Sequence, residues 1–206
     1  MINLKDIEYQ INKKIILQKI NLMIHKNKTT VIMGKNGSGK STLLKLLNQI
    51  IKPTSGSLAS VLESPVPMLF QKPLLLKNTV NYNYQILQKI KKNKINHNWF
   101  KKFQLSSIKN QNVNTLSGGE KQKLFLARTM SYDQEYLFLD EPNQNLDLES
   151  ENLLVELLIH EKQKKTIVMT QHDFQITKKL ADYVIYLDKG QILFNESKNN
   201  FFKKFN

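Results

Sequence analysis

Eight consecutive residues, Gly34 to Ser41, have the types and spacing of a loop that binds phosphate groups. They fit the pattern G-x-x-x-x-G-K-[ST], in which glycines let backbone N–H groups curl around phosphates. Lys40 is placed to reach the β- and γ-phosphates, and the hydroxyl of Ser41 can bind Mg²⁺. The loop lies between an apolar, β-branched run at Thr29–Met33 and leucines at helical spacing from Leu43. A glycine turn that merely precedes a helix would not need Lys then Ser, so the sequence predicts a nucleotide site.

A second apolar run, Leu137–Leu139, ends in two carboxylates, Asp140 and Glu141. Alone, a strand that ends in Asp is more often a solvated strand terminus. Together with the phosphate loop, the pair is better interpreted as the second half of a nucleotide site. Asp140 would then hold Mg²⁺, usually through water, and Glu141 would orient or deprotonate the attacking water.

At this point the chain resembles a family, the ATP-binding cassette (ABC) ATPases. Leu116-Ser117-Gly118-Gly119-Glu120 is similar to the family's signature motif. Four further features follow the family's order: the adenine-stacking aromatic, the Q-loop glutamine, the D-loop and the switch histidine, matched here by Tyr9, Gln71, Asn145-Leu146-Asp147 and His172. Each alone would pass for an ordinary strand, surface or loop residue, but five in the right order make coincidence negligible.

The resemblance implies an ATPase that uses ATP and Mg²⁺. It implies three catalytic residues, Gln71, Glu141 and His172, and three metal ligands, Ser41, Gln71 and Asp140. It also implies the ATP-binding residues of one chain, which are Tyr9, Gly34, Lys35, Asn36, Gly37, Ser38, Gly39, Lys40, Ser41 and Thr42.

The signature loop forms a second anion site at the start of a helix. One chain cannot place two distant helix N-termini on one γ-phosphate, but two copies can. The resemblance accordingly implies two cassettes packed head to tail, with ATP between the phosphate loop of one and Ser117, Gly118, Gly119 and Glu120 of the other, and with Asp147 in the D-loop.

Three departures from the family leave the ligands of ATP and Mg²⁺ in place. Gln144-Asn145 stands where the D-loop usually has small residues, Lys123 where arginine is more usual, and Asn27-Lys28 where Gly-Glu is common. They leave open how tightly hydrolysis is coupled across the dimer.

The pattern of elements predicts an α/β fold: a P-loop NTPase (ABC ATPase) core with a parallel sheet, N-terminal antiparallel strands and a small inserted helical subdomain. We expect one ABC ATPase domain over 1–206, with the helical subdomain at 72–131. Short strands are expected at Ile7–Ile11, Ile15–Leu17 and Ile20–Ile24, and a helix from Leu43 to Ile51. Phe201, Phe202 and Phe205 favour a terminal helix that packs on its own domain over a contact with lipid.

The composition is that of a folded globular chain of 206 residues, 40% of them hydrophobic, with no cysteine for disulfides or metal binding. The chain lacks a run of about 18 apolar residues and a secretory start, so we expect it in the cytoplasm, peripheral on the inner face of the cell membrane.

The formal net charge of +14 is unevenly distributed. Residues 64–119 contain nine lysines and no acidic residue, whereas residues 133–161 contain nine carboxylates and no lysine or arginine. Such a charge could indicate nucleic acid, but the single arginine and the wealth of Lys, Asn and Ile are equally typical of a genome's codon bias. Trp99, Phe100 and Phe103 fit a small local core better than a stacking surface, so no nucleic-acid partner is expected.

The partners follow from the resemblance. Cassettes that act on nucleic acid usually have two cassettes in one chain or a very long insertion after the Q-loop; here Gln71 and Ser117 are only about 45 residues apart. Residues 70–80 are similar to the Q-loop of bacterial small-solute importers, most of all those for tungstate- or molybdate-type oxyanions. We therefore expect an integral membrane permease, a second copy or a homologous cassette, and a substrate-binding protein as partners.

Two other functions remain as alternatives. One is a non-transport cassette that acts on nucleic acid or in cofactor assembly, and the other is a regulatory nucleotide-binding module without turnover. Glu141 and His172 argue against the second. The sequence does not name the solute, the permease or the direction of transport.

Overall fold

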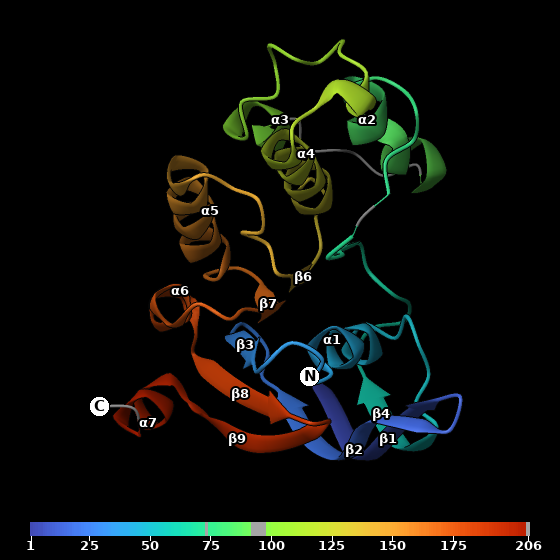
Figure 1. Ribbon diagram of the computed structural model, residues 1–206, viewed down its shortest axis with the longest axis vertical. Coiled ribbons are helices and arrows are strands. Elements are labelled where there is room, and N and C mark those ends of the chain that lie inside the picture. Colours follow the sequence, from blue (N-terminus) through green and yellow to red (C-terminus); the bar gives the residue numbers. More distant parts are fainter. Residues whose placement is uncertain (73, 92–97, 205–206) are drawn as a thin grey trace.

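The computed structural model describes residues 1–72, 74–91 and 98–204, and it has an α/β architecture with two sheets and a group of helices at one end (Figure 1). The strands are β1 (Ile2–Ile11), β2 (Lys14–Ile24), β3 (Thr29–Met33), β4 (Ser55–Ser60), β5 (Met68–Leu69), β6 (Tyr136–Asp140), β7 (Thr166–Thr170), β8 (Tyr183–Asp188) and β9 (Gln191–Ser197). The helices are α1 (Lys40–Leu47), α2 (Val80–Lys91), α3 (Asn98–Lys102), the 3₁₀ turn η1 (Val113–Thr115), α4 (Gly118–Met130), α5 (Leu148–Glu161), α6 (Phe174–Leu180) and α7 (Lys198–Lys203).

The larger sheet has the strand order β5-β6-β7-β3-β8-β9. Strands β5 to β8 pair in parallel, as the sequence predicts, and β9 adds an antiparallel edge. Successive side chains of its central strands enter two different cores: Val31 and Met33 pack with α4 to α7, and Ile32 packs with α1. Both faces of the sheet are therefore covered, and its carboxyl-terminal edge is left for a site.

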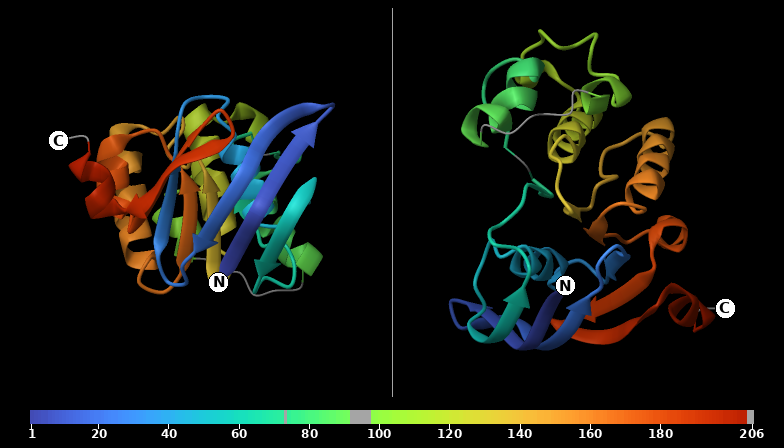
Figure 2. Two further views of the ribbon diagram at one scale, coloured as in Figure 1. Left: turned by 90° about the horizontal axis from the view of Figure 1, so that it is seen from below. Right: turned by 180° about the vertical axis from the view of Figure 1, so that it is seen from behind.

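The N-terminal strands form a separate antiparallel sheet of order β2-β1-β4, which lies across α1 from the larger sheet (Figure 2). The prediction of short strands there was wrong, because β1 and β2 have ten and eleven residues. The turn Asn12-Lys13 has positive φ at both residues (49° and 66°), which matches the twist of two long paired strands. The Ser- and Gly-rich β4 was missed because its composition is typical of a turn.

Helix α1 ends at Leu47, earlier than the hydrophobic spacing predicts. The amide of Asn48 donates to the carbonyl oxygen of Val66 (2.8 Å) and accepts from its N–H (3.0 Å). This side chain thus fixes the chain after the helix, and Ile50 and Ile51 lie beyond it.

The helices α2, α3 and α4 gather at the end of the molecule away from β1, β2 and β4 (Figure 1). Trp99 and Phe103 are buried there, so the prediction of a core in place of a stacking surface is confirmed, but that core is not a separate local one. That core is continuous with the one on the sheet, because Tyr84 and Leu124 belong to the same buried cluster as Val31. The subdomain boundaries at 72–131 stay a prediction, and Pro73, Lys92 and Lys94 lie outside the described residues.

The C-terminal helix α7 packs on its own domain, as expected. Phe201 is fully buried and lies between the rings of Phe174, Tyr186 and Phe194. Phe205 lies outside the described residues. Among the helices of the described residues, none is both long enough and apolar enough to cross a membrane.

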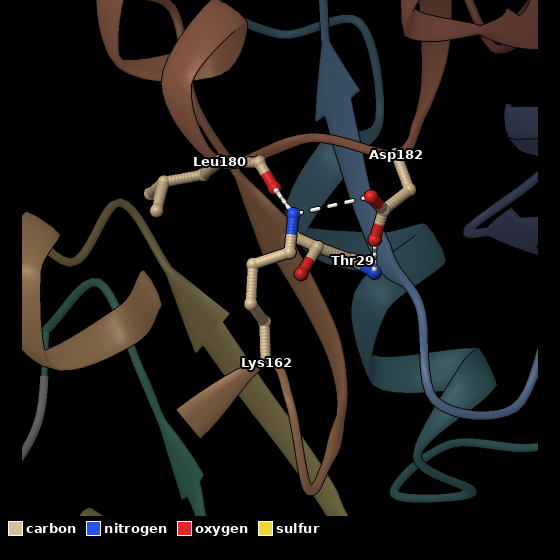
Figure 3. Close-up of polar contacts among 4 residues, drawn as sticks. All are labelled: Thr29, Lys162, Leu180 and Asp182. Carbon is tan, nitrogen blue, oxygen red and sulfur yellow. Dashed lines mark hydrogen bonds and ion pairs between the residues drawn. The ribbon is translucent and has the colours of Figure 1, made fainter. Parts of the chain in front are cut away.

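Asp182 joins the start of β3 to the end of α5 (Figure 3). Its carboxylate accepts from the backbone N–H of Thr29 (2.8 Å) and from Lys162 Nζ (3.1 Å), which also donates to the carbonyl oxygen of Leu180 (2.9 Å). The backbone N–H of Asp182 donates to Thr29, and its carbonyl oxygen accepts from Lys198 at the start of α7. One residue therefore holds the strand that leads into the phosphate loop.

We predict that Asp182→Ala lowers the free energy of unfolding by about 2 to 4 kcal/mol, because it leaves the buried N–H of Thr29 without an acceptor and takes one of two acceptors from the Lys162 ammonium group. Asp182→Asn keeps an acceptor oxygen and should lower the free energy of unfolding by about half as much. Chemical denaturation checks this, with Asp133→Ala at an exposed position as the control. Equal stability of Asp182→Ala and the control would contradict this role.

Candidate nucleotide-binding site

The phosphate loop connects the carboxyl end of β3 to the N-terminus of α1. Lys40, the first residue of the helix, is only 6% exposed, and its Nζ donates to the carbonyl oxygens of Gly34 (2.8 Å) and Lys35 (3.1 Å). An ammonium group has three donors, so a third can reach a phosphate oxygen. The lysine thus closes the loop on itself and concentrates positive charge at the helix start.

Two observations show that the loop fits phosphate. The Oγ of Ser38 is buried and has no hydrogen-bond partner in the part of the chain that the structure describes. Gly39 precedes α1 without a side-chain cap, so the first-turn N–H groups can bind an anion. A cavity of about 630 Å³ opens beside them, lined by Lys14, Ile15, Ile16, Asn36, Gly37, Gly39, Lys40, Ser41, Thr42, Gln71, Glu141 and Lys189.

Thr170 at the end of β7 links the carboxylate of Asp140 to the backbone of Glu141. The Thr170 hydroxyl donates to Asp140 Oδ1 (2.6 Å) and accepts from the backbone N–H of Glu141 (2.9 Å). Asp140 is 2% exposed, whereas Glu141, with φ of 48°, turns into the cavity. Gln71 Nε2 donates to Glu141 Oε2 (3.0 Å), so the Q-loop and the predicted base are in direct contact.

The oxygen atoms predicted to bind Mg²⁺, those of Ser41, Asp140 and Gln71, fit the ion in their chemistry, although Asp140 does not line the described cavity. A hydroxyl, a carboxylate and the amide oxygen of Gln71 are hard donors of the kind that Mg²⁺ prefers. No group of three or more His, Asp or Glu side chains able to hold a metal occurs among the described residues. An ion here would therefore need phosphate oxygens from the nucleotide as further ligands.

Tyr9 and His172, both predicted from the resemblance, do not line the cavity as far as the structure describes the chain. Tyr9 lies opposite Leu17 and packs against the core beneath the N-terminal sheet. His172 is exposed on the loop between β7 and α6. The structure therefore gives no support to adenine stacking on Tyr9.

The signature and D-loop residues also lie outside the cavity. Ser117 and Glu120 cap α4 reciprocally: Glu120 N–H donates to Ser117 Oγ (3.2 Å), and Ser117 N–H donates to Glu120 Oε2 (2.8 Å). Asp147 caps α5, and hydrogen bonds from the side chain and backbone of Ser150 lower its pKa. Asn145 of the D-loop lies within 3.5 Å of the Cβ position of Gly118, so the two motifs adjoin.

Sequence reasoning gave no site role to Thr170, Gln171 or Asn143. Gln171 is fully buried; its Nε2 donates to Asn143 Oδ1 (3.0 Å), and its Oε1 accepts from the N–H groups of His172 and Asp173. The signal for Thr170 was its place at the end of a strand parallel to β6. No local pattern marked Ile15, Ile16 and Lys189 as lining residues.

A phosphate loop after a central parallel strand, with a carboxylate pair at the end of a nearby strand, is the arrangement of a P-loop protein that hydrolyses nucleoside triphosphates. The family model described as "ABC transporter" matches residues 17–144. The chain therefore belongs to the ABC transporter family. It is an ABC ATPase, the ATP-binding subunit of a transporter.

Relatives and solved structures agree with this assignment. The zinc import ATP-binding protein ZnuC of Wigglesworthia glossinidia brevipalpis is 32% identical over 207 residues, covering 96% of this chain and 87% of the relative. The petrobactin import ATP-binding protein YclP of Bacillus subtilis (strain 168) is 29% identical over 215 residues, covering 94% and 85%. The dimeric post-hydrolysis state of the ATP-binding cassette MJ0796, bound to ADP and Pi, aligns with a TM-score of 0.85 at 25% identity, covering 96% of this chain and 99% of that one.

We predict that Lys40→Ala weakens ATP binding by about 10- to 100-fold, because a charge-assisted contact with phosphate contributes roughly 1.5 to 3 kcal/mol. Titration calorimetry measures the change. Lys45→Ala, on the same helix but outside the cavity, is the control. Unchanged affinity of the Lys40 variant would contradict the assignment of the phosphate loop.

Proposed function

We propose that this chain is the ATP-hydrolysing subunit of a membrane importer for a small solute, that it works as a head-to-tail dimer, and that it docks on an integral membrane permease. The observation that carries the proposal is the cavity in which Lys40, Ser41, Gln71 and Glu141 meet while Ser117 lies outside. This cavity holds half of an ATP site. A second copy of the chain would supply the other half.

The predicted functional residues each have a chemical task in this proposal, including Asp140, which is buried and does not line the described cavity. Lys40 and the N–H groups of the loop bind the β- and γ-phosphates, and Ser41 and Asp140 hold Mg²⁺, which would neutralise charge on the transferred phosphoryl group. Glu141 accepts a proton from the attacking water. Gln71, through its hydrogen bond to Oε2, orients that carboxylate and leaves its own amide oxygen for the metal.

The second copy would contribute its signature loop. The first turn of α4 presents backbone N–H groups beside the exposed Gly118, and a γ-phosphate is the anion that they would bind. Asn145, which adjoins Gly118, would then lie at the contact between the two chains. ATP bound between the copies would hold them together, and hydrolysis would release them.

The permease would dock in an apolar groove of about 620 Å³ between the sheet and the helical group. Ile50, Pro65, Val66, Pro67, Met68, Phe70, Lys72, Leu74, Arg128 and Thr129 line it. Leu74 is 87% exposed and Leu76 51% exposed, which is unusual for leucines without an apolar partner. A short amphipathic helix of the permease is the occupant that suits such a groove.

Charge in the groove indicates what that helix would carry. Arg128, the only arginine of the chain, lies 5.3 Å from the ring of Phe125, and its guanidinium nitrogens are 3.4 Å from the carbonyl oxygen of Leu74. Burial lowers its pKa, and no acidic side chain lines the groove in the described part of the chain. A carboxylate on the docking helix would pair with the Arg128 guanidinium and so stabilise its charged form.

The names of the relatives, which concern zinc and petrobactin import, support an importer. A substrate-binding protein as a further partner and a place at the inner face of the membrane stay predictions. The names of the relatives lend no support to a tungstate- or molybdate-type solute.

We predict that Glu141→Gln keeps ATP binding but slows hydrolysis by roughly 10²- to 10⁴-fold, the usual contribution of a general base. Because the change also removes a negative charge facing the γ-phosphate, an ATP-bound dimer should accumulate. Gel filtration with ATP and Mg²⁺ measures it, with Glu63→Gln at an exposed position as the control. A variant that binds ATP yet stays monomeric would contradict the head-to-tail dimer.

The docking groove is tested by a crosslink from a single introduced cysteine, since the chain has none of its own. Leu74→Cys should crosslink to an integral membrane protein in native membranes. Leu193→Cys, on β9 and 53% exposed, should not. Salt-sensitive binding of DNA or RNA without any membrane partner would instead support the nucleic-acid alternative.

A further inference from the structure

The cavity has an aliphatic surface on the side that is not formed by the phosphate loop, Gln71 or Glu141. Its lining residues there are Ile15 and Ile16 of β2, flanked by Lys14 and Lys189. No aromatic side chain lines the cavity among the described residues. The surface next to the triphosphate site therefore offers a nucleobase no ring to stack on.

A β-bulge explains how two successive isoleucines line the same cavity. In the pairing of β1 with β2, Gln10 lies opposite Ile15 but Tyr9 lies opposite Leu17, so Ile16 is the extra residue. Such a bulge bends the strand and re-aims its side chains. The same register places Tyr9 opposite Leu17, which is fully buried, and so turns the tyrosine toward the core.

The aliphatic surface is held rigidly against the phosphate loop. The N–H of Gln18 donates to the carbonyl oxygen of Gly190 (2.9 Å). The N–H of Gly190 in turn donates to the carbonyl oxygen of Ser38 in the phosphate loop (3.0 Å). A Cβ at Gly190 would lie 2.4 Å from the carbonyl oxygen of Ile16, and one at Gly39 would lie 2.8 Å from the Leu17 side chain. Only glycines permit this close contact between β2, the phosphate loop and the turn before β9. Strand β9 itself lies beside β2 (Figure 1).

We propose that the nucleobase rests on Ile15 and Ile16, and that this site takes purine and pyrimidine nucleoside triphosphates with similar affinity. The proposal rests on the proposed function of the same cavity, and it specifies the class of substrate. An aliphatic surface contacts any base by dispersion alone.

The side chains that flank this surface do not single out adenine. The amino group of adenine or cytosine needs an acceptor, and the side chains of Lys14 and Lys189 carry only donors. Both lysines are exposed and suit the acceptor atoms that every base presents. Affinity should therefore come from the triphosphate. The factor of about 5 to 150 that base–aromatic stacking contributes elsewhere should be missing.

Equilibrium binding of ATP, GTP, CTP, UTP and inorganic tripolyphosphate to the wild-type chain tests the proposal without reliance on hydrolysis. We expect the four nucleotides to bind within about five-fold of one another. A preference for ATP of more than about 20-fold would overturn the inference and leave the proposed function standing. If neither the nucleotides nor tripolyphosphate bind, both this inference and the proposed function are wrong.

Three variants locate the surface. Ile15→Ala should weaken the binding of all four nucleotides by roughly 3- to 10-fold and leave the binding of tripolyphosphate unchanged, because it removes only apolar contact with the base. Met23→Ala, an exposed apolar residue at the other end of β2, is the matched control. A larger loss of ATP affinity in Tyr9→Leu than in Ile15→Ala, at unchanged melting temperature, would identify the tyrosine as the base platform and overturn the inference.

Discussion

The parallel pairing of β3, β7 and β6 is the constraint on which the nucleotide site depends. Thr170 in β7 is in register with Ile32 in β3 on one side and with Asp140 in β6 on the other. The threonine hydroxyl can therefore reach the carboxylate while β3 delivers the chain to the phosphate loop. A slip of one residue in either ladder would turn Asp140 to the other face of the sheet and separate it from the loop.

The rest of the fold keeps this register in place. Buried side chains on both faces of β3 remove any alternative alignment, and Asp182 fixes the residue at which the strand begins. Helix α4 is tied to the same edge, since Gln122 Nε2 donates to the carbonyl oxygen of Pro142 (2.8 Å) just after Glu141. The signature loop, the D-loop and the catalytic edge are therefore parts of one rigid arrangement, although they face different sides of the molecule.

Sequence reasoning identified those parts of the site whose chemistry is written in consecutive residues. The phosphate loop and the Asp140-Glu141 pair need only a local motif between recognisable elements, and the structure places both at the predicted edge. The contact of Gln71 with Glu141 agrees with the resemblance. Tyr9 stays a prediction that the structure does not support, because one extra residue in β2 decides which side chains face the cavity, and a bulge leaves no mark in hydrophobic periodicity. The roles of Ser117 and Asp147 stay predictions, since they concern a contact between two chains. The catalytic role of His172 also stays a prediction, because this exposed side chain does not line the described cavity.

The hydrogen bond between Gln71 and Glu141 has a consequence for how ATP hydrolysis is coupled to the docking groove. Leu74, in the groove, follows Gln71 by only three residues, so roughly 10 Å of extended chain at most separates the two positions. Hydrogen bonds weaken steeply once the donor and acceptor separate beyond about 3.5 Å. An ångström of displacement at the groove is thus enough to alter how the carboxylate is held. In the proposed function, a permease helix that displaces Leu74 would therefore also change how the Glu141 carboxylate is oriented, so that docking and proton transfer would be linked through a few residues of chain.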